Sequence, residues 1–336
     1  MSVTIKEIAV AAGLSHQTVS FVLGKKAHLF KPATQKRVRD AAQRLGYRPN
    51  ASARAMRNGR FNTIAILLST DNSRSTVFTN FLIGAESAAR QSGNHLLVTA
   101  MPDQQLTDPD FVPRILSEAS SDGFLLNYYV NVPPQLADLI TRCRVPSIWT
   151  NDRRKRDCVY PDDFGAGRTA TQRLIQQGHR RIAYLDCTHS HPLNPSRDHY
   201  SAFDRHGGYL AAMREAGLPV REFMPADALR NVEVLHAMKE WLARPDRPSA
   251  VVTYCEVEVF AVMHAARDLN LKLPDDLAMA SFSEIPIHVG MAPVTTMVIP
   301  LYELGEIAVQ QLIKKIARPE RELAPRPVEF GMHSEK

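Results

Sequence analysis

The stretch that decides the fold of the N-terminal segment is residues 4–23, TIKEIAVAAGLSHQTVSFVL. Thr4 and Glu7 have the spacing of a capping box, in which two side chains satisfy unpaired amides at the start of a helix. The apolar residues that follow recur at helical spacing, and Gly13 is placed to end that helix. Ser15 can cap a second helix. The second helix would bury three apolar side chains: Val19, Val22 and Leu23.

A third helix is predicted over residues 33–45, with Pro32 in its first turn and Gly46 after its end. Its inward side chains would be Val38, Ala42 and Leu45. Two short helices joined by a glycine-containing turn and followed by a supporting helix are typical of the helix-turn-helix. We therefore predict an all-α helix-turn-helix DNA-binding domain over residues 1–48.

The start of the second helix would point into the major groove of DNA. His16 and Gln17 are its first exposed side chains; Gln can hold adenine through paired hydrogen bonds, and His can donate or accept at a base edge. Phe21 lies on the same face and can offer only apolar contact, for example to a thymine methyl, unless it packs inward against the third helix. Phosphate contacts, which position the protein without specifying sequence, are expected from five polar side chains: Thr4, Ser15, Thr18, Ser20 and Lys36.

The charge of the chain is strongly asymmetric. Residues 1–60 contain twelve Lys and Arg and two acidic residues, which gives this segment a net charge of +10. The net charge of the whole chain is +6, so that of the remaining residues is −4. A basic head on a mildly acidic body indicates a module that binds a polyanion. A merely solvated basic surface is the alternative that charge alone leaves open.

From residue 62 onward, apolar runs typical of buried strands alternate with helical patterns. The first two runs are 63–69 (TIAILLS) and 95–101 (HLLVTAM), with an amphipathic helix between them that ends at Gly93. Similar runs follow at 122–128, 146–152, 181–187, 250–256 and 277–283. This alternation predicts parallel α/β layers in two units. Ligands of open α/β sheets bind outside the carboxyl ends of the strands, so those ends are where we expect a ligand.

The composition excludes several classes of protein. No apolar run approaches the roughly 20 residues of a membrane span, and the N-terminus lacks the basic start and long apolar segment of a secretory signal. Four cysteines stand singly without a CxxC pair, which argues against a disulfide framework or a zinc site and fits a reducing cytoplasm. We expect a cytoplasmic protein that has no membrane contact, no metal and no cofactor.

The quoted stretch and residues 37–60 (RVRDAAQRLGYRPNASARAMRNGR) together resemble the DNA-binding head and hinge of the LacI/GalR (lactose-repressor) family. The resemblance implies that His16, Gln17 and the residue at position 21 read bases. The third of these is commonly basic in the family, so Phe21 departs from the pattern and puts a guanine contact there in doubt. Lys31 is a milder departure, because the family usually has a capping serine at that position.

The hinge, residues 49–61, has helical composition but almost nothing to bury, so it should be frayed when alone. The resemblance implies that it folds only on DNA, where it pairs with its dimer mate in the minor groove and levers a base step open with an apolar residue. Met56 occupies that position. Asn50 can start the hinge helix, and Arg54 and Arg57 can reach phosphates.

Resemblance to the family extends along nearly the whole body, through motifs such as 163–186 (DFGAGRTATQRLIQQGHRRIAYLD) and 292–313 (APVTTMVIPLYELGEIAVQQLI). It implies an α/β periplasmic-binding-protein-like fold with two lobes, three crossovers and a small molecule between the lobes. We place this effector-binding and dimerisation domain at residues 62–336. Its first lobe is expected at about residues 62–160 plus 292–320, and its second at about 161–291.

Residues at the expected strand ends are candidates for effector binding. Arg205 stands where the family often has an arginine that clamps ligand hydroxyls or carboxylates, and Asn151 ends the 146–152 strand. The family's usual Asn-Asp pair is Cys255-Glu256 here, and its Gly-Phe-Asp ends in Ser283. Possible ring surfaces are Phe78, Tyr128 and Trp149. A site that loses hydrogen-bond acceptors binds polyols less well. We therefore infer an effector that is less sugar-like, or one that is anionic if Arg205 faces the cleft. A sugar-derived effector bound by other residues is the alternative.

Other motifs have simpler structural interpretations. His179 is expected in a turn before a strand. His189 and His191 could bind a metal, but no third ligand has diagnostic spacing, so an exposed loop is expected. Cys255 could sense oxidants, but a buried strand end favours an inert thiol. The proline-containing tail after Arg318 cannot form a tetramerising helix, so we expect a homodimer.

The leading hypothesis is a sequence-specific transcriptional regulator, a repressor, whose affinity for a pseudo-palindromic double-stranded operator depends on a small-molecule effector. A solute-binding protein of transport would share the body fold but would need a signal peptide and no basic head. An α/β enzyme is the third class. The sequence contains no glycine-rich phosphate loop, nucleophile elbow or metal-ligand helix, so no catalytic residue is assigned.

Overall fold

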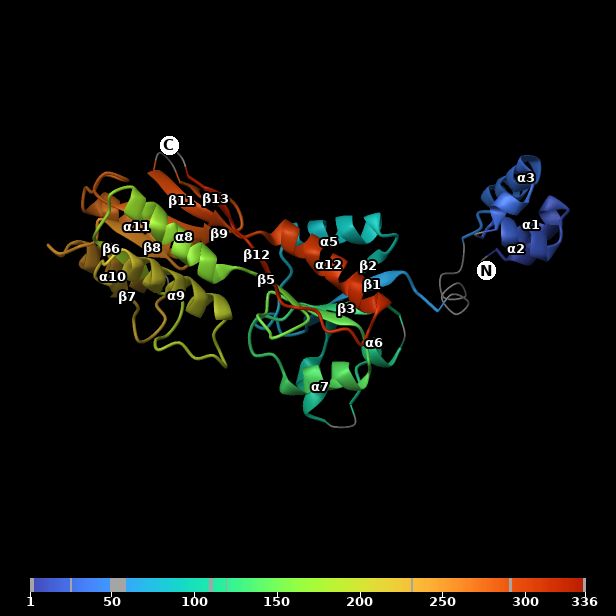
Figure 1. Ribbon diagram of the computed structural model, residues 1–336, viewed down its shortest axis with the longest axis horizontal. Coiled ribbons are helices and arrows are strands. Elements are labelled where there is room, and N and C mark those ends of the chain that lie inside the picture. The colour runs from blue at the N-terminus through green and yellow to red at the C-terminus, as the bar shows by residue number, and fades with distance from the viewer. Residues whose placement is uncertain are drawn as a thin grey trace. The chain divides into compact units, whose positions relative to one another are not determined.

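The computed structural model describes residues 3–24, 26–48, 59–108, 111–118, 120–230, 232–289 and 292–334. The chain divides into two compact units, Met1–Phe61 and Asn62–Lys336 (Figure 1). Within the described ranges, no helix is both long and apolar enough to cross a membrane.

The first unit contains α1 (Ile5–Ala12), α2 (His16–Val22) and α3 (Pro32–Arg44), with a 3-10 turn, η1 (Ala27–Leu29), before α3. Its small core is made of buried apolar side chains from all three helices: Ile8, Ala9, Ala12, Val19, Val22, Val38, Ala41 and Ala42. The prediction that Leu45 points inward is wrong, because α3 ends at Arg44 and the side chain of Leu45 is 36% exposed. Ala41 takes the buried position of the last turn.

The helix ends of the first unit are held as their sequence predicts. The Thr4 amide donates to Glu7 Oε2 at 2.6 Å and the Glu7 amide to Thr4 Oγ1 at 3.4 Å, which confirms the capping box. Gly13 ends α1 in the left-handed conformation with φ of 58°. Arg37 of α3 donates from Nε to Ala12 O at 2.6 Å and from Nη2 to Gly13 O at 2.8 Å, so it satisfies carbonyls that the end of α1 leaves unpaired.

One sheet of the second unit has the strand order β12-β5-β4-β3-β1-β2, and all its strand pairs are parallel. The strands are β1 (Thr63–Ser69), β2 (His95–Met101), β3 (Gly123–Leu126), β4 (Ser147–Thr150), β5 (Cys158–Pro161) and β12 (Arg326–Val328). The helical elements with this sheet are α5 (Thr79–Gln91), η2 (Asp103–Thr107), α6 (Arg114–Ser117), α7 (Pro134–Arg142) and α12 (Leu301–Ala317). We call this sheet and its helices the first lobe. Its buried residues form two clusters, one of which includes residues of α5 and α12 and the other residues of α7.

The second sheet has the order β10-β11-β9-β8-β6-β7, and β13 pairs with β11. The strands are β6 (Ile182–Leu185), β7 (Glu222–Phe223), β8 (Ala250–Thr253), β9 (Ala278–Ser283), β10 (His288–Val289), β11 (Ala292–Val298) and β13 (Gly331–His333). The helices are α8 (Asp163–Gln176), α9 (Tyr200–Glu215), α10 (Val232–Leu242) and α11 (Glu256–Asp268). This sheet and its helices form the second lobe. The strands expected from the sequence are all present and parallel, whereas β10 and β13 add antiparallel pairs.

The chain passes between the lobes three times: from β5 to α8, from β11 to α12, and from β12 to β13. The expected lobe boundary at residue 292 needs correction, because β11 pairs in parallel with β9, with Val294 opposite Met279. Val294 and Met297 of β11 are buried in the apolar clusters of the second lobe. Only α12 and β12 return to the first lobe.

Candidate functional site

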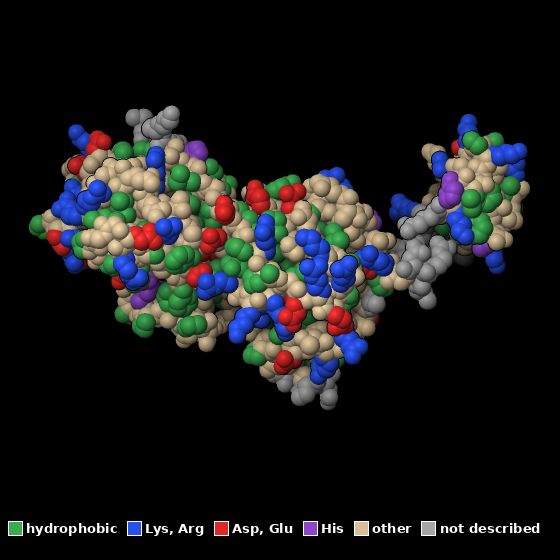
Figure 2. All heavy atoms as spheres, viewed as in Figure 1, with side chains coloured by type: hydrophobic (Ala, Val, Ile, Leu, Met, Phe, Trp, Pro, Cys, Tyr) green, Lys and Arg blue, Asp and Glu red, His purple; other side chains and the backbone are tan. Residues whose placement is uncertain are grey.

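The exposed face of α2 carries the two side chains expected to read DNA. His16 and Gln17 are both exposed in its first turn. Ser15 Oγ accepts a hydrogen bond from the Thr18 amide at 3.1 Å and lies 2.9 Å from Thr18 Oγ1, which fixes the start of the helix. Ser20 is half-buried, and Thr4 and Lys36 are exposed on the neighbouring elements. Lys and Arg dominate the charged side chains on the visible face of this unit in Figure 2.

Phe21 is half-buried and makes two ring contacts that the sequence does not reveal. Its ring centroid lies 6.4 Å from that of Phe30, at an interplanar angle of 45°. Lys26 Nζ lies 4.8 Å from the Phe21 ring centroid. Phe21 therefore packs beside η1 rather than into the core against α3, and it carries a cation on its ring. The predicted DNA contacts in the hinge, Asn50, Arg54, Met56 and Arg57, lie outside the described residues.

A cavity of about 1030 Å³ opens between the two lobes of the second unit. The first lobe contributes Arg74 and the segments 103–104, 129–135 and 152–154 to its wall, and the second lobe contributes residues between 195 and 203. Such a volume suits a small ligand. Several of these segments follow strands of the first sheet, as ligand sites of open α/β sheets do.

Arginine–aspartate pairs dominate the charge around this cavity. Four of its arginines each contact an aspartate: Arg74 with Asp103 (3.4 Å), Arg153 with Asp204 (2.9 Å), Arg154 with Asp152 (2.7 Å) and Arg197 with Asp198 (2.9 Å). The positive and negative charges of these pairs balance. A guanidinium has five N–H donors, so each arginine keeps donors beyond its ion pair. Tyr129, Tyr200 and Phe203 add aromatic surface to the wall.

None of the seven side chains expected to bind the effector lines this cavity among the described residues. Tyr128 is fully buried, and Phe78 packs against the core beside α5. Trp149 lies beneath Arg154, whose guanidinium carbon is 3.5 Å from the ring centroid. Two lining segments, 129–135 and 152–154, begin one position after Tyr128 and Asn151, whereas within the described ranges no lining residue follows β8 or β9, the strands whose ends carry Cys255 and Ser283. The charged run 152–154 after the fourth strand was the signal that could have identified them.

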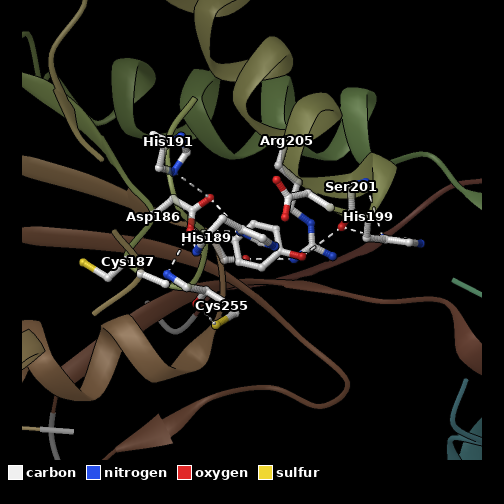
Figure 3. Close-up of polar contacts among 12 residues, drawn as sticks. Asp186, Cys187, His189, His191, His199, Ser201, Arg205 and Cys255 are labelled. Atoms are coloured by element: carbon white, nitrogen blue, oxygen red, sulfur yellow. Dashed lines mark hydrogen bonds and ion pairs between the residues drawn. The ribbon is translucent and has the colours of Figure 1, made fainter. Parts of the chain in front are cut away.

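Arg205 is turned into the second lobe. Its side chain (Figure 3) donates from Nε to Asp163 Oδ1 at 2.7 Å and from Nη1 to Tyr254 O at 2.8 Å. Its guanidinium lies over the rings of Tyr254 and Phe282. Close packing of α8 on α9 fixes its backbone, because a Cβ at Gly167 would overlap the Arg205 carbonyl. Arg205 therefore does not face the cavity. The inference of an anionic effector required that it did, so this inference loses its basis.

A chain of hydrogen bonds leads from Arg205 to the first lobe. Tyr254, which accepts from Arg205, has its hydroxyl 3.0 Å from Ser201 Oγ. Ser201 Oγ lies 2.8 Å from His199 Nδ1 (Figure 3). His199 Nε2 lies 2.8 Å from Asn151 O. Asn151 thus takes part through its backbone carbonyl. Burial lowers the pKa of His199, against the effect of its hydrogen bond to Asn151.

The two remaining candidates, Cys255 and Ser283, lie at the ends of β8 and β9. Cys255 caps α11, donates from Sγ to Glu258 Oε2 at 3.1 Å, and has its pKa raised to about 12 by burial and the charge of Glu258, which favours the inert thiol. Ser283 Oγ donates to Glu256 Oε2 at 2.6 Å.

Two histidines expected in an exposed loop are half-buried instead. His189 Nδ1 lies 2.9 Å and His191 Nε2 3.5 Å from Asp186 Oδ2, so both imidazoles turn onto a buried carboxylate (Figure 3). Across the described ranges, no three His, Cys, Asp or Glu side chains are grouped so that they could hold a metal ion. His179 lies 3.1 Å from Ser249 Oγ in the turn before β6, where its structural interpretation places it.

Comparison with known proteins finds two matching family models. Residues 4–50 match the bacterial regulatory proteins of the lacI family, and residues 171–331 match a periplasmic binding protein-like domain. The ribose operon repressor of Escherichia coli (strain K12) is 30% identical over 322 residues, which cover 94% of this chain and 94% of that protein. The catabolite control protein A of Priestia megaterium is 26% identical over 319 residues, covering 94% and 92%.

Solved structures share the whole architecture. The lac repressor dimer bound to operator and the anti-inducer ONPF aligns with a TM-score of 0.75 at 18% identity, covering 99% of this chain and 98% of that one. The complex of the transcriptional regulator CelR with cellobiose aligns with a TM-score of 0.62 at 23% identity, covering 98% of each chain. At these identities the likeness is one of fold.

Proposed function

The chain belongs to the lacI family of bacterial regulatory proteins, and on that premise we propose that it binds its operator through His16 and Gln17 and is controlled by a neutral, polyhydroxylated effector in the cavity between its lobes. It is a DNA-binding transcriptional repressor that acts as a dimer, with each α2 in one half-site of a pseudo-palindrome. The exposure of His16 and Gln17 directly after the helix cap supports their role at base edges. Thr4, Ser20 and Lys36 are proposed to contact phosphates, and Met56 to wedge into the minor groove.

We infer the chemical class of the effector from the balanced charge of the cavity. An anion would have to compete with the aspartates that already neutralise Arg74, Arg153, Arg154 and Arg197. Hydroxyl groups can accept from the remaining N–H donors and donate to the carboxylates, and sugar rings can stack on the aromatic wall. The relatives support the same class, since one is named for the ribose operon and another is solved with cellobiose.

The proposal is tested by thermal shift with a panel of neutral sugars and matching acids. D-ribose, D-glucose and cellobiose are compared with D-ribonate and D-gluconate. A member of the neutral set should raise the melting temperature, and Arg154→Ala should abolish the shift. Arg168→Ala is the control, because Arg168 pairs with Glu215 on the surface of the second lobe. A shift produced by the acids alone would contradict a neutral effector. Genome-wide mapping of binding sites identifies the operator.

A further inference from the structure

His199 links the two lobes through one hydrogen bond. His199 directly precedes α9 in the second lobe, and its Nε2 lies 2.8 Å from the carbonyl oxygen of Asn151, which follows β4 in the first lobe. A carbonyl only accepts, so Nε2 must carry the proton. Nδ1 is then the acceptor for the Ser201 amide at 3.4 Å and caps α9. One imidazole in one tautomer thus caps a helix and joins the lobes.

The chain neighbours of both partners of this bond line the cavity. Asp198 and Tyr200, on either side of His199, line the cavity, as do Asp152 and Arg153, which follow Asn151. A ligand that fills the cavity therefore contacts the chain neighbours of both partners of the bond.

The backbone of Asn151 is shaped for this contact. Its φ is 56°, in the left-handed region that Asn tolerates better than most residues. Its amide donates to Val159 O at 3.0 Å, which anchors it to β5 while its carbonyl points to His199. The conformation of Asn151, rather than its side chain, is what the contact requires.

We propose that His199 is a positioning residue whose hydrogen bond to the Asn151 carbonyl holds the lobes at one relative angle, and that the effector acts by altering this bond. The part that concerns the effector rests on the proposed function. The link between the lobes does not, since both of its partners belong to this chain.

The test separates the link from the helix cap. His199→Asn keeps a good capping side chain for α9 but is too short to reach Asn151. His206→Asn is the matched control, because His206 lies on the same helix and contacts Glu222 within the second lobe, at 2.6 Å. A second pair acts on the acceptor: Asn151→Gly preserves the left-handed conformation, whereas Asn151→Val disfavours it.

The measurement is the distance distribution between spin labels on non-natural amino acids at Asp138 and Glu240, two exposed positions in different lobes. Without any effector, His199→Asn and Asn151→Val should shift or broaden the distribution, while His206→Asn and Asn151→Gly should match the unmodified protein. An unchanged distribution in His199→Asn, or an Nδ1-protonated His199 by ¹⁵N NMR, would overturn the proposal.

The role of the effector is tested by repeating the distance measurement with the sugar that gives the thermal shift. That sugar should move the distribution of the unmodified protein toward that of His199→Asn and should change the variant little; an equal change in both overturns the coupling. If no sugar of the panel binds, the proposed effector class fails, and the ligand-free distances still decide whether His199 links the lobes.

Discussion

The guanidinium of Arg205 and the carboxylate of Asp163 form an ion pair within the second lobe, with Nε 2.7 Å from Oδ1 and side chains 8% and 1% exposed. The pair joins α9 to the first turn of α8. It gives Arg205 a structural role within the second lobe.

Arg205→Ala should destabilise the protein strongly. It removes one partner of a buried pair and leaves Asp163 charged without compensation, which costs about 3–5 kcal/mol of the free energy of unfolding. Arg168→Ala breaks an exposed pair with Glu215, which solvent screens, and should change that free energy far less. Urea unfolding of both variants measures the difference. Equal losses would show that Arg205 is not held as the geometry indicates.

The pH dependence of Asp204 follows from its burial, which raises its pKa to about 6 against the opposing charge of Arg153. Because this pKa lies above the ordinary 3.8, the folded protein holds the proton more tightly than the unfolded chain. The resulting stabilisation is complete below pH 3.8 and is lost as the pH rises through about 6. The Asp204→Asn variant has no titrating group at this position and does not lose this stabilisation. Between about pH 4 and pH 7 its free energy of unfolding should therefore increase relative to that of the unmodified protein. If the free energies of unfolding of the two proteins changed with pH in the same way, the raised pKa of Asp204 would be contradicted.

Local patterns in the sequence predicted most of the fold, whereas contacts made by loops did not follow from them. The capping box of Thr4 and Glu7 and the apolar strand runs depend on neighbouring residues, and both are confirmed. The lining of the cavity depends on how far each loop runs past its strand, as at Arg154. The same applies to Arg205, whose partner Asp163 is 42 positions away. The pairing of β11 with β9 likewise depends on tertiary contacts, which the periodicity of the sequence cannot predict.

Ser15→Ala should weaken the DNA-binding unit. Ser15 Oγ accepts from the Thr18 amide at 3.1 Å, and the loss of such a cap costs about 0.5–2 kcal/mol. The melting transition of the first unit should fall, while that of the second stays the same. Ser20→Ala is the control, because Ser20 lies inside α2 and caps nothing. Similar effects of both changes would exclude the cap as the cause.

Gln17→Ala should relax the preference for one base pair in each half-site, at a cost of about 1–3 kcal/mol for the preferred sequence. Gln17 is exposed in the first turn of α2, where a side chain can reach a base edge. Selection from a random DNA library by the unmodified and variant proteins gives the two preference profiles. Identical profiles would remove Gln17 from base recognition.

Lys26→Ala should reduce the salt dependence of DNA binding. Lys26 Nζ lies 4.8 Å from the Phe21 ring centroid, so the ring holds an ammonium beside α2, the helix proposed to enter the major groove, and we expect this ammonium to contact a DNA phosphate. Loss of one phosphate contact lowers the slope of log affinity against log salt by about 1. Lys239→Ala is the control, because Lys239 pairs with Asp268 in the second unit. Phe21→Leu removes the aromatic face but stays apolar, so it should reproduce part of the Lys26→Ala effect; an unchanged slope in both would show that the ring does not place Lys26 on DNA.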